Sequence, residues 1–213
     1  MQKSGNVSNS VIRRLPLYYR ALSEIEREGK LRVSSAELAN RMRLTASQIR
    51  QDLNCFGVFG QQGYGYDVAH LRVSVEELLG LNRAHPTIMI GGGNLGRAVA
   101  IYLREKGKER GYDIQAIFEK SKELIGRPVN DINVLDVSTL RAYCHSNQPK
   151  AAILCVDSAA AESVMDDLYS GGIRCYWNFS HYDIEKHYSG VVVENVRLSD
   201  SLMTLSYYIA HED

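Results

Sequence analysis

Short apolar runs alternate with amphipathic stretches along the second half of the chain. Residues Thr87 to Ile90 are apolar and rich in β-branched types, and they are followed by closely spaced glycines and by "RAVAIYL" at helical spacing. Further strand-like runs cover Ile114 to Phe118, 151–156 and 173–179, and "SAAAESVMDDLYSGG" has the pattern of a helix. Buried strands that alternate with helices in this way predict an α/β fold with a Rossmann-type, doubly wound parallel sheet.

Hydrophobic spacing in the first half predicts three helices. In "LPLYYRALSEIEREG" the spacing places Leu15, Tyr19, Leu22 and Ile25 on one apolar stripe. A short helix follows in "VSSAELANRM" with Ser35 as its N-cap, and "LTASQIRQDLNCFG" forms another after a tight connection. A short helix, a turn and a second helix are the layout of a helix-turn-helix.

The last of these helices separates an inward face from a polar one. Ile49, Leu53 and Phe56 share the inward side. The polar residues on the other side can read base edges or hold phosphates, and they are Ser47, Gln48, Arg50, Gln51 and Asn54. The glycine-rich "GVFGQQGYGYDV" that follows suits a small β-hairpin, which completes a winged helix. An ordinary three-helix bundle shares this spacing and remains the alternative.

Length and charge favour two domains with different partners. The 213 residues carry no formal net charge, but residues 1–57 contain ten Lys/Arg and five Asp/Glu. The basic excess at one end supports a modest electrostatic attraction to DNA, so a dimer that reads two half-sites is the expected route to useful affinity. We expect a disordered segment at 1–10, a winged-helix domain at 11–82, a dinucleotide-binding domain at 83–198 and a C-terminal helix at 199–213.

The glycines after the first strand of the second half have the spacing of a dinucleotide-binding turn. Gly91, Gly93 and Gly96 form G-x-G-x-x-G between a predicted strand and a predicted helix. Glycine here permits a tight turn, close approach of a pyrophosphate, and packing of the helix on the strand. Glu119 lies 23 residues beyond Gly96 at the end of the next strand. A carboxylate there can bind the ribose hydroxyls and disfavours a 2′-phosphate, so NAD(H) is expected; the alternative is a solvated glutamate.

Ligands of such sheets bind beyond the carboxyl ends of the strands. Asp157, Ser158, Asn178 and Phe179 therefore face the expected nicotinamide end. His181 is available there as a proton donor, but too few residues follow the sheet to form a substrate domain, so no catalytic residue is expected. The predicted cofactor-binding residues are Gly91, Gly92, Gly93, Asn94, Leu95, Gly96, Glu119, Lys120, Val156, Asp157, Asn178 and Phe179.

Other features narrow the class of protein. The cysteines Cys55, Cys144, Cys155 and Cys175 show no C-x-x-C spacing and no paired histidines, so no metal site is expected. Cys55 is interpreted as a buried structural thiol; the alternative is a thiol that makes DNA binding sensitive to oxidants. No run of about 18 apolar residues and no secretory signal occur, which predicts a cytoplasmic protein without a membrane partner.

The chain resembles the redox-sensing transcriptional repressor Rex family. The resemblance runs from about Val11 to His211 and is most specific in "RLPLYYR", "SSAELA", "ASQIRQDL", "FGQQGYGYDV", "GGGNLGRAVAIY", "GGIRCYWNFS" and "LSDSLMTLSYYI". It implies a homodimer whose winged helix binds a palindromic operator and whose Rossmann domain senses NADH against NAD⁺, with NADH releasing the DNA. It also implies that the last helix, about Ser199 to Ile209, reaches across to the partner subunit; packing on its own sheet is the alternative.

The resemblance also implies DNA contacts from the wing. The predicted wing residues are Gln61, Gln62, Tyr64, Gly65 and Tyr66. Gln51, Gln61 and Gln62 stand where many members have a basic residue, which implies an altered operator preference or a weaker attraction to phosphate. Glu119 stands where an aspartate is usual and keeps the carboxylate.

Three positions match the family's switch contact between redox states. Tyr102 and Arg20 keep the expected types, but Arg197 occupies the place of an aspartate. Two cations cannot form an ion pair, so either Asp200 or another acid substitutes, or the coupling runs through helix packing alone. Two other readings remain open: an NAD-dependent oxidoreductase with an accessory helical domain, and a DNA-binding module whose Rossmann domain is only a dimerisation platform.

Overall fold

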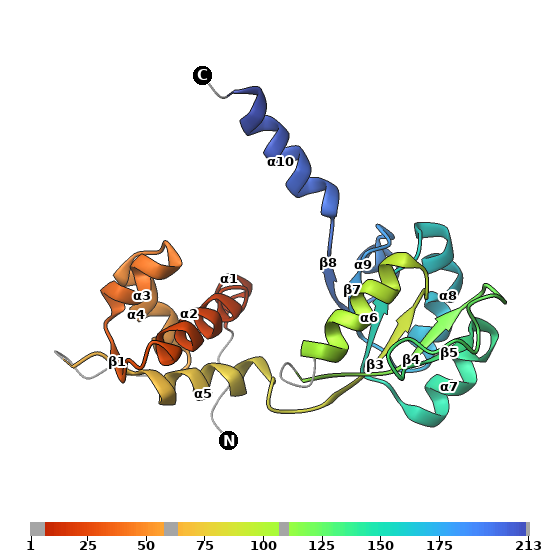
Figure 1. Ribbon diagram of the computed structural model, residues 1–213, viewed down its shortest axis with the longest axis horizontal. Helices are drawn as coiled ribbons and strands as arrows, with labels where there is room; N and C mark the ends of the chain where they lie inside the picture. Colours follow the sequence, from red (N-terminus) through yellow and green to blue (C-terminus); the bar gives the residue numbers. More distant parts are fainter. Residues whose placement is uncertain (1–6, 58–63, 107–110, 212–213) are drawn as a thin grey trace. The chain divides into compact units, whose positions relative to one another are not determined.

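The computed structural model describes residues 7–57, 64–106 and 111–211 (Figure 1). The chain divides into two compact units, Met1–Asn82 and Arg83–Asp213. A first helix, α1 (Asn9–Ile12), begins inside the segment 1–10 that the sequence predicted to be disordered, so that prediction was wrong for its last residues.

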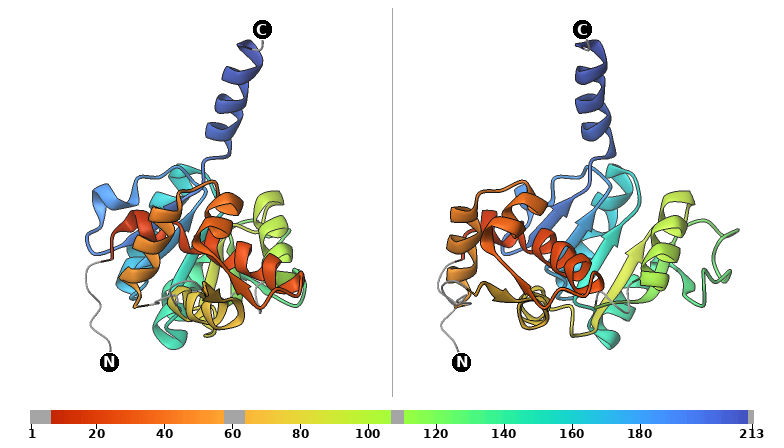
Figure 2. Two further views of the ribbon diagram at one scale, coloured as in Figure 1. Left: turned by 90° about the vertical axis from the view of Figure 1, so that its left-hand side faces the viewer. Right: turned by 60° about the vertical axis from the view of Figure 1, so that its left-hand side comes forward.

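The first unit is a helical bundle with a two-stranded sheet (Figure 2). Its remaining elements are α2 (Leu15–Arg27), β1 (Arg32–Val33), α3 (Ser35–Met42), α4 (Ala46–Cys55), β2 (Tyr66–Asp67) and α5 (Val68–Leu79). The strands pair antiparallel, with Arg32 opposite Asp67. Helices α3 and α4 form the expected helix-turn-helix, and β2, which follows α4, pairs with β1. The fold class predicted for this unit is confirmed, whereas most of the predicted β-hairpin falls on residues outside the described ones. The predicted wing residues Gln61 and Gln62 lie outside the described residues.

The inward face of α2 differs from the predicted one by one position. Leu15, Tyr18, Leu22 and Ile25 are buried, whereas Tyr19 is only half-buried. Spacings of three, four and three residues keep one stripe on a helix, and Tyr19 lies about 100° further round than Tyr18. The sequence interpretation chose the wrong member of a Tyr-Tyr pair.

Side-chain caps fix where the short helices begin. Ser34, not the predicted Ser35, caps α3, and its Oγ accepts from the N–H of Glu37 at 3.1 Å. Thr45 caps α4 in the same way through the N–H of Gln48 at 3.1 Å. Asp67 caps α5 through the N–H of His70 at 2.9 Å, and the sequence interpretation missed this helix. Each cap satisfies a first-turn donor that has no partner inside its helix.

The second unit contains a six-stranded sheet in the order β5-β4-β3-β6-β7-β8. All its neighbouring strands run parallel. The strands are β3 (His85–Ile90), β4 (Tyr112–Glu119), β5 (Asn133–Asp136), β6 (Ala151–Leu154), β7 (Cys175–Asn178) and β8 (Val192–Asn195). The helices are α6 (Asn94–Lys106), the 3-10 turn η2 (Val137–Thr139), α7 (Leu140–Asn147), α8 (Ser158–Ser170), α9 (Ile184–His187) and α10 (Leu198–Ala210).

Helices cover both faces of this sheet, as a doubly wound fold requires. Ile88 and Ile90 of β3 belong to one apolar cluster, which includes Leu168 of α8. Met89, between them, belongs to the other cluster with Leu103 of α6. Alternate residues of a strand point to opposite faces, so β3 is buried on both sides. Strand order reverses between β3 and β6, which makes their carboxyl ends the topological switch point where such sheets bind ligands.

The C-terminal helix α10 has no buried residue (Figure 1). Its apolar side chains Leu202, Leu205 and Tyr208 are 64%, 53% and 63% exposed. The alternative in which α10 packs on its own sheet is therefore not the arrangement of this chain. None of the helices among residues 7–57, 64–106 and 111–211 is long and apolar enough to cross a membrane.

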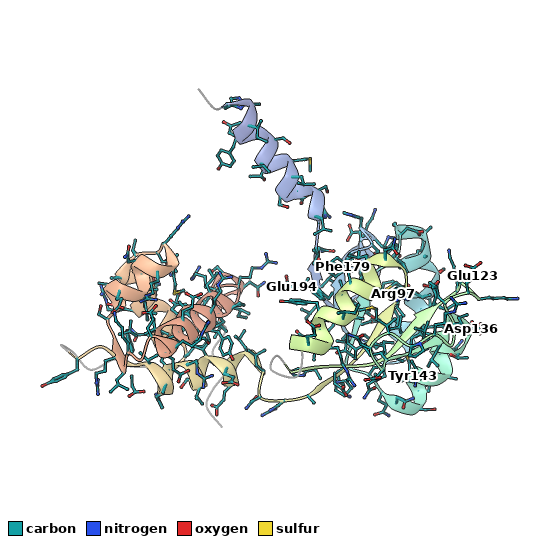
Figure 3. The ribbon with its side chains drawn as sticks, in the orientation of Figure 1. Arg97, Glu123, Asp136, Tyr143, Phe179 and Glu194 are labelled. Carbon is teal, nitrogen blue, oxygen red and sulfur yellow. The ribbon has the colours of Figure 1, made fainter. Side chains whose placement is uncertain are left out.

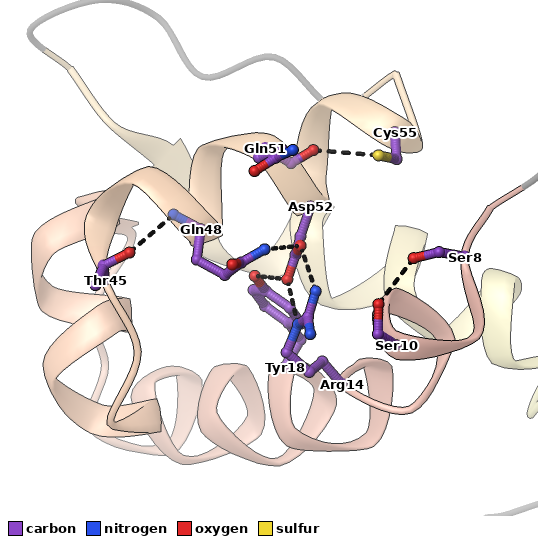
Figure 4. Close-up of polar contacts among 9 residues, drawn as sticks. All are labelled: Ser8, Ser10, Arg14, Tyr18, Thr45, Gln48, Gln51, Asp52 and Cys55. Atoms are coloured by element: carbon purple, nitrogen blue, oxygen red, sulfur yellow. Dashed lines mark hydrogen bonds and ion pairs between the residues drawn. The ribbon is translucent and has the colours of Figure 1, made fainter.

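A buried ion pair joins the start of α2 to α4 (Figure 4). The side chain of Asp52 is fully buried, and its two oxygens accept from Arg14 Nε at 2.7 Å and Arg14 Nη2 at 2.8 Å. Tyr18 Oη donates at 3.0 Å and Gln48 Nε2 at 2.8 Å. Burial by itself raises the pKa of Asp52, but the hydrogen bonds from Arg14, Gln48 and Tyr18 outweigh burial and hold the pKa below its usual value.

We predict that Arg14→Ala lowers the free energy of unfolding by about 3 kcal/mol, because it leaves a buried carboxylate without its counter-charge. This is the low end for buried pairs, since 21% of the Arg14 side chain is exposed. Urea unfolding of the full chain measures the change. Arg41→Ala removes an exposed bidentate pair with Glu28 and serves as the matched control, with a much smaller effect expected.

The same pair predicts a pH dependence. Because the folded pKa of Asp52 is depressed, its contribution is present above the unfolded value and is lost as the pH falls through the folded pKa. The stability difference between wild type and Arg14→Ala should therefore shrink below about pH 4. A difference that stays constant into acid would contradict an ionised Asp52.

Candidate nucleotide-binding and DNA-binding sites

The glycine turn between β3 and α6 is built by close backbone approach. Gly91 has φ 97°, and a Cβ there would lie 2.5 Å from the carbonyl oxygen of Cys155. A Cβ on Gly96 would lie 2.0 Å from the carbonyl oxygen of Gly91. Both positions therefore need glycine for the fold itself, because no larger residue fits without a backbone shift.

Gly93 differs from Gly91 and Gly96. It is exposed, and its φ is not in the left-handed region. Among the described residues, its two chain neighbours aside, no atom lies within 4 Å of a Cβ built on it. The protein itself does not require glycine there. An incoming pyrophosphate does, because it must approach the backbone at the start of α6, where the first N–H groups lack partners inside the helix. The residues of the turn therefore fit a dinucleotide.

Glu119 ends β4 and turns its carboxylate toward the glycine turn. Oε2 accepts from the N–H of Gly92 at 2.7 Å, and Oε1 accepts from the N–H groups of Lys120 at 2.8 Å and Ser121 at 3.0 Å. Burial opposes ionisation of Glu119, but these backbone donors outweigh it and lower its pKa. An ionised carboxylate at this position can accept from ribose hydroxyls and repels a second phosphate on the ribose.

The predicted residues at the nicotinamide end have different surroundings. Val156 lies beside the turn, since its Cγ1 would be 2.7 Å from a Cβ on Gly91. Asp157 caps α8 by accepting from the N–H of Ala160 at 2.8 Å. Phe179 is half-buried against Trp177, with ring centroids 4.8 Å apart; Figure 3 labels it together with Arg97 of α6. Their contacts with a cofactor remain predictions.

Asn178 is almost fully buried and uses all of its side-chain hydrogen-bonding capacity. Its Oδ1 accepts from the N–H of Ser180 at 3.0 Å and from Ser180 Oγ at 2.6 Å, while Nδ2 donates to the carbonyl oxygen of Tyr182 at 2.9 Å and to Asn195 Oδ1 at 2.8 Å. We therefore assign this side chain to shaping the loop after β7. In the same loop His181 has φ 64°, which is uncommon for a non-glycine residue.

The polar face of α4 presents most of the predicted DNA contacts. Ser47, Arg50, Gln51 and Asn54 are exposed, and Gln48 is half-buried. Arg50 Nη1 donates to Ser35 Oγ at 3.1 Å, which holds the guanidinium against the start of α3.

The described part of the wing presents one predicted side chain and hides another. Tyr64 is 71% exposed, whereas Tyr66 is 8% exposed and packs in the core, which leaves its side chain no surface for DNA. Gly65 has φ 69°, and a Cβ there would lie 2.5 Å from the carbonyl oxygen of Val33, so the turn itself needs glycine. Arg32 Nη1 donates to the carbonyl oxygen of Tyr64 at 3.4 Å, which places a cation missed by sequence reasoning beside the wing.

The cysteines do not form a metal or disulfide site. All four are free, and Cys55 is exposed, so its interpretation as a buried thiol was wrong. Cys144 is buried, which raises the pKa of its thiol to about 11. No cluster of three His, Cys, Asp or Glu residues suited to a metal ion occurs among the described residues.

A winged helix-turn-helix on the same chain as a dinucleotide-binding turn defines a class of ligand-responsive DNA-binding proteins. Two family models match: "Putative DNA-binding protein N-terminus" over residues 6–54 and "CoA binding domain" over residues 82–182. The chain belongs to the family of redox-sensing transcriptional repressors named Rex. The Rex protein of Clostridium tetani is 43% identical over 213 residues, which is the full length of both chains.

Other relatives agree with this membership. The Rex protein of Caldanaerobacter subterraneus subsp. tengcongensis is 45% identical, covering 100% of this chain and 94% of that protein. A solved structure of RSP with β-NAD⁺ and operator DNA is similar at TM-score 0.89 and 44% identity, covering 96% of this chain and 93% of that one. RSP with β-NADH gives 0.85 and 41%, covering 96% and 95%. These relatives are repressors rather than enzymes, which agrees with the expectation of no catalytic residue.

We predict that Gly93→Ala weakens NADH binding at least about tenfold, a loss of 1.4 kcal/mol, while shifting Tm by less than about 3 °C. The new methyl group should meet the ligand and not the protein, since no atom of the described residues beyond the two chain neighbours lies within 4 Å of its position. Calorimetric titration with NADH and thermal unfolding measure the two effects.

Gly96→Ala is the contrasting variant, because its methyl group would collide with the carbonyl oxygen of Gly91 and should lower Tm clearly. If Gly93→Ala binds NADH as tightly as wild type, the pyrophosphate does not lie on this turn.

Proposed function

We propose that this chain represses transcription as a homodimer that binds a palindromic operator and releases it when NADH binds. Membership of the Rex family supports this, as do the titles of the similar RSP structures, which name β-NAD⁺, β-NADH and operator DNA as ligands of RSP. A regulator of this kind works where the chromosome is, which in bacteria such as the named relatives is the cytoplasm.

The observation that carries the proposal is Gly93, an exposed glycine of the turn that the fold does not need and a pyrophosphate does. Glu119, held in its ionised form beside Gly92, selects a ribose with free hydroxyls. NAD(H) meets both requirements. The family model that matches residues 82–182 is named for coenzyme A binding. Coenzyme A also contains adenosine and a pyrophosphate, but it carries an additional phosphate on its ribose.

The exposed apolar helix α10 supports the homodimer. Leu198, Leu202, Met203 and Leu205 are all more than half exposed, and they lie on a helix without a buried residue. Contiguous apolar surface of this kind is rarely left in water. We propose that a second copy of the chain covers α10. The resulting dimer also has the two recognition helices that a palindromic operator requires.

The sensor needs no chemistry on the cofactor. NADH has to bind the dimer arrangement that releases DNA more tightly than the arrangement that holds it, because equal affinity for both would shift nothing. The proposed switch residues Arg20, Tyr102 and Arg197 are exposed, on α2, on α6 and at the N-cap of α10. Asp200 in the first turn of α10 is the acid that can replace the missing aspartate.

Fluorescence anisotropy of a labelled palindromic duplex, titrated with protein at fixed salt, tests the proposal. We expect specific binding that NADH weakens and NAD⁺ does not. Specific binding that ignores both nucleotides would reduce the second unit to a dimerisation platform, and release by coenzyme A in place of NADH would replace the proposed ligand. The absence of specific binding to any duplex would contradict the proposed function.

Arg197 offers a sharper test of the coupling. It is the N-cap of α10 but makes no side-chain cap hydrogen bond. Arg197→Asp restores an acid for the switch pair and also adds a helix cap, worth about 1 kcal/mol. Arg197→Asn adds the cap without the charge and is the matched control.

We expect Arg197→Asp, but not Arg197→Asn, to change the factor by which NADH weakens operator binding by at least about threefold, within the usual range of coupling free energies. The same anisotropy titration measures it. An identical response of both variants and wild type would show that position 197 has no part in the switch.

A further inference from the structure

The buried carboxylate of Asp52 controls the orientation of a side chain on the DNA-facing surface of α4. Gln48 lies four residues before Asp52, so the two side chains share a helix face. Gln48 Nε2 donates to Asp52 Oδ1 at 2.8 Å, while the other acceptor positions of the carboxylate are taken by Arg14 and Tyr18 (Figure 4). An ionised carboxylate only accepts hydrogen bonds, so the amide of Gln48 must turn its nitrogen inward.

The inward nitrogen leaves a defined pattern on the outside. One hydrogen of Gln48 Nε2 is used by Asp52, and the second hydrogen and Oε1 have no partner among residues 7–57, 64–106 and 111–211. The outer surface of Gln48 is therefore one donor beside one acceptor. A glutamine with a free side chain presents either end of its amide, but this one is fixed before DNA arrives.

We infer that Gln48, positioned by the Arg14–Asp52 pair, reads an adenine in the major groove of each half-site. This inference rests on the proposed operator binding. Adenine presents the N7 acceptor and the N6 donor side by side, which the free N–H and the carbonyl oxygen of Gln48 match. Guanine presents two acceptors, N7 and O6, so O6 would face the carbonyl oxygen of Gln48 without a proton between them.

Arg14 and Asp52 act here as positioning residues and do not contact the base. Asp52 is fully buried and Arg14 mostly so. Their part is to keep the amide of Gln48 in one orientation, because a flip would place its oxygen against the carboxylate. A glutamine and an aspartate at this spacing also stabilise a helix on their own account, so the test has to measure base discrimination rather than stability.

The experiment starts with the full-length wild type. The preferred half-site is selected from palindromic duplexes with randomised half-sites, and the dissociation constant is then measured for all four base pairs at each position. We expect one position at which A·T is preferred over G·C by about tenfold or more, the size of one good bidentate contact. Gln48→Ala should reduce this preference to below about threefold at that position only.

The positioning role is tested by Arg14→Lys, which keeps the charge but loses the two-pronged contact with Asp52. It should weaken the adenine preference in the wild-type background and have no further effect on that ratio in the Gln48→Ala background. Arg41→Lys makes the same chemical change in the exposed Arg41–Glu28 pair and should leave the base preferences unchanged. Urea unfolding midpoints confirm that each variant is folded.

The outcomes separate this inference from the proposed function. A wild type that selects no duplex contradicts operator binding and the inference together. Specific binding in which Gln48→Ala keeps every base preference, or in which the preference lost is for guanine or cytosine, overturns the inference alone. If Arg14→Lys weakens all duplexes equally in both backgrounds, the pair is structural and the positioning role is wrong.

Discussion

The carboxylate of Asp52 is the interaction on which the geometry of the recognition helix depends. It is buried, ionised and met by donors from α4 itself and from Arg14 and Tyr18 at the start of α2. A charge in the interior is tolerated only when its hydrogen-bonding positions are filled. The side chains of Arg14, Tyr18 and Gln48 are therefore fixed in one arrangement around Asp52. The proposed recognition helix α4 is thereby fixed against α2 by a buried ion pair and its hydrogen bonds.

The second unit applies the same constraint to backbone atoms. Gly91 lies against the carbonyl oxygen of Cys155, and Gly96 of α6 lies against the carbonyl oxygen of Gly91, so that no side chain fits at either position. Glu119 is held by three backbone donors beside the turn. Gly93 is exposed at the N-terminus of α6, where free backbone N–H groups suit a pyrophosphate. In both units the groups proposed to meet a ligand lie beside a carboxylate that is held by several hydrogen bonds.

The local parts of this structure could be predicted from the sequence because their signals are local. The glycine turn, Glu119 at the end of β4 and the helix-turn-helix were confirmed in position, although their ligand contacts remain predictions. What the sequence did not predict depends on distant partners. Asp52 looks like a surface acid until Arg14, 38 positions away, lies beside it, and the burial of Asn178 depends on Asn195, 17 positions on. The sequence interpretation missed helix α5, although Asp67 caps its N-terminus and Gly80 its C-terminus.

In the proposed mechanism, the nucleotide and the operator bind different arrangements of one dimer. Linkage requires that if NADH weakens operator binding by some factor, the operator weakens NADH binding by the same factor. The most direct measurement is the dissociation constant of NADH, by calorimetry, for the free protein and for the protein saturated with its operator duplex. We expect NADH to bind the operator complex more weakly than the free protein, by the same factor by which NADH weakens operator binding. Equal NADH affinity in the two states would contradict this mechanism.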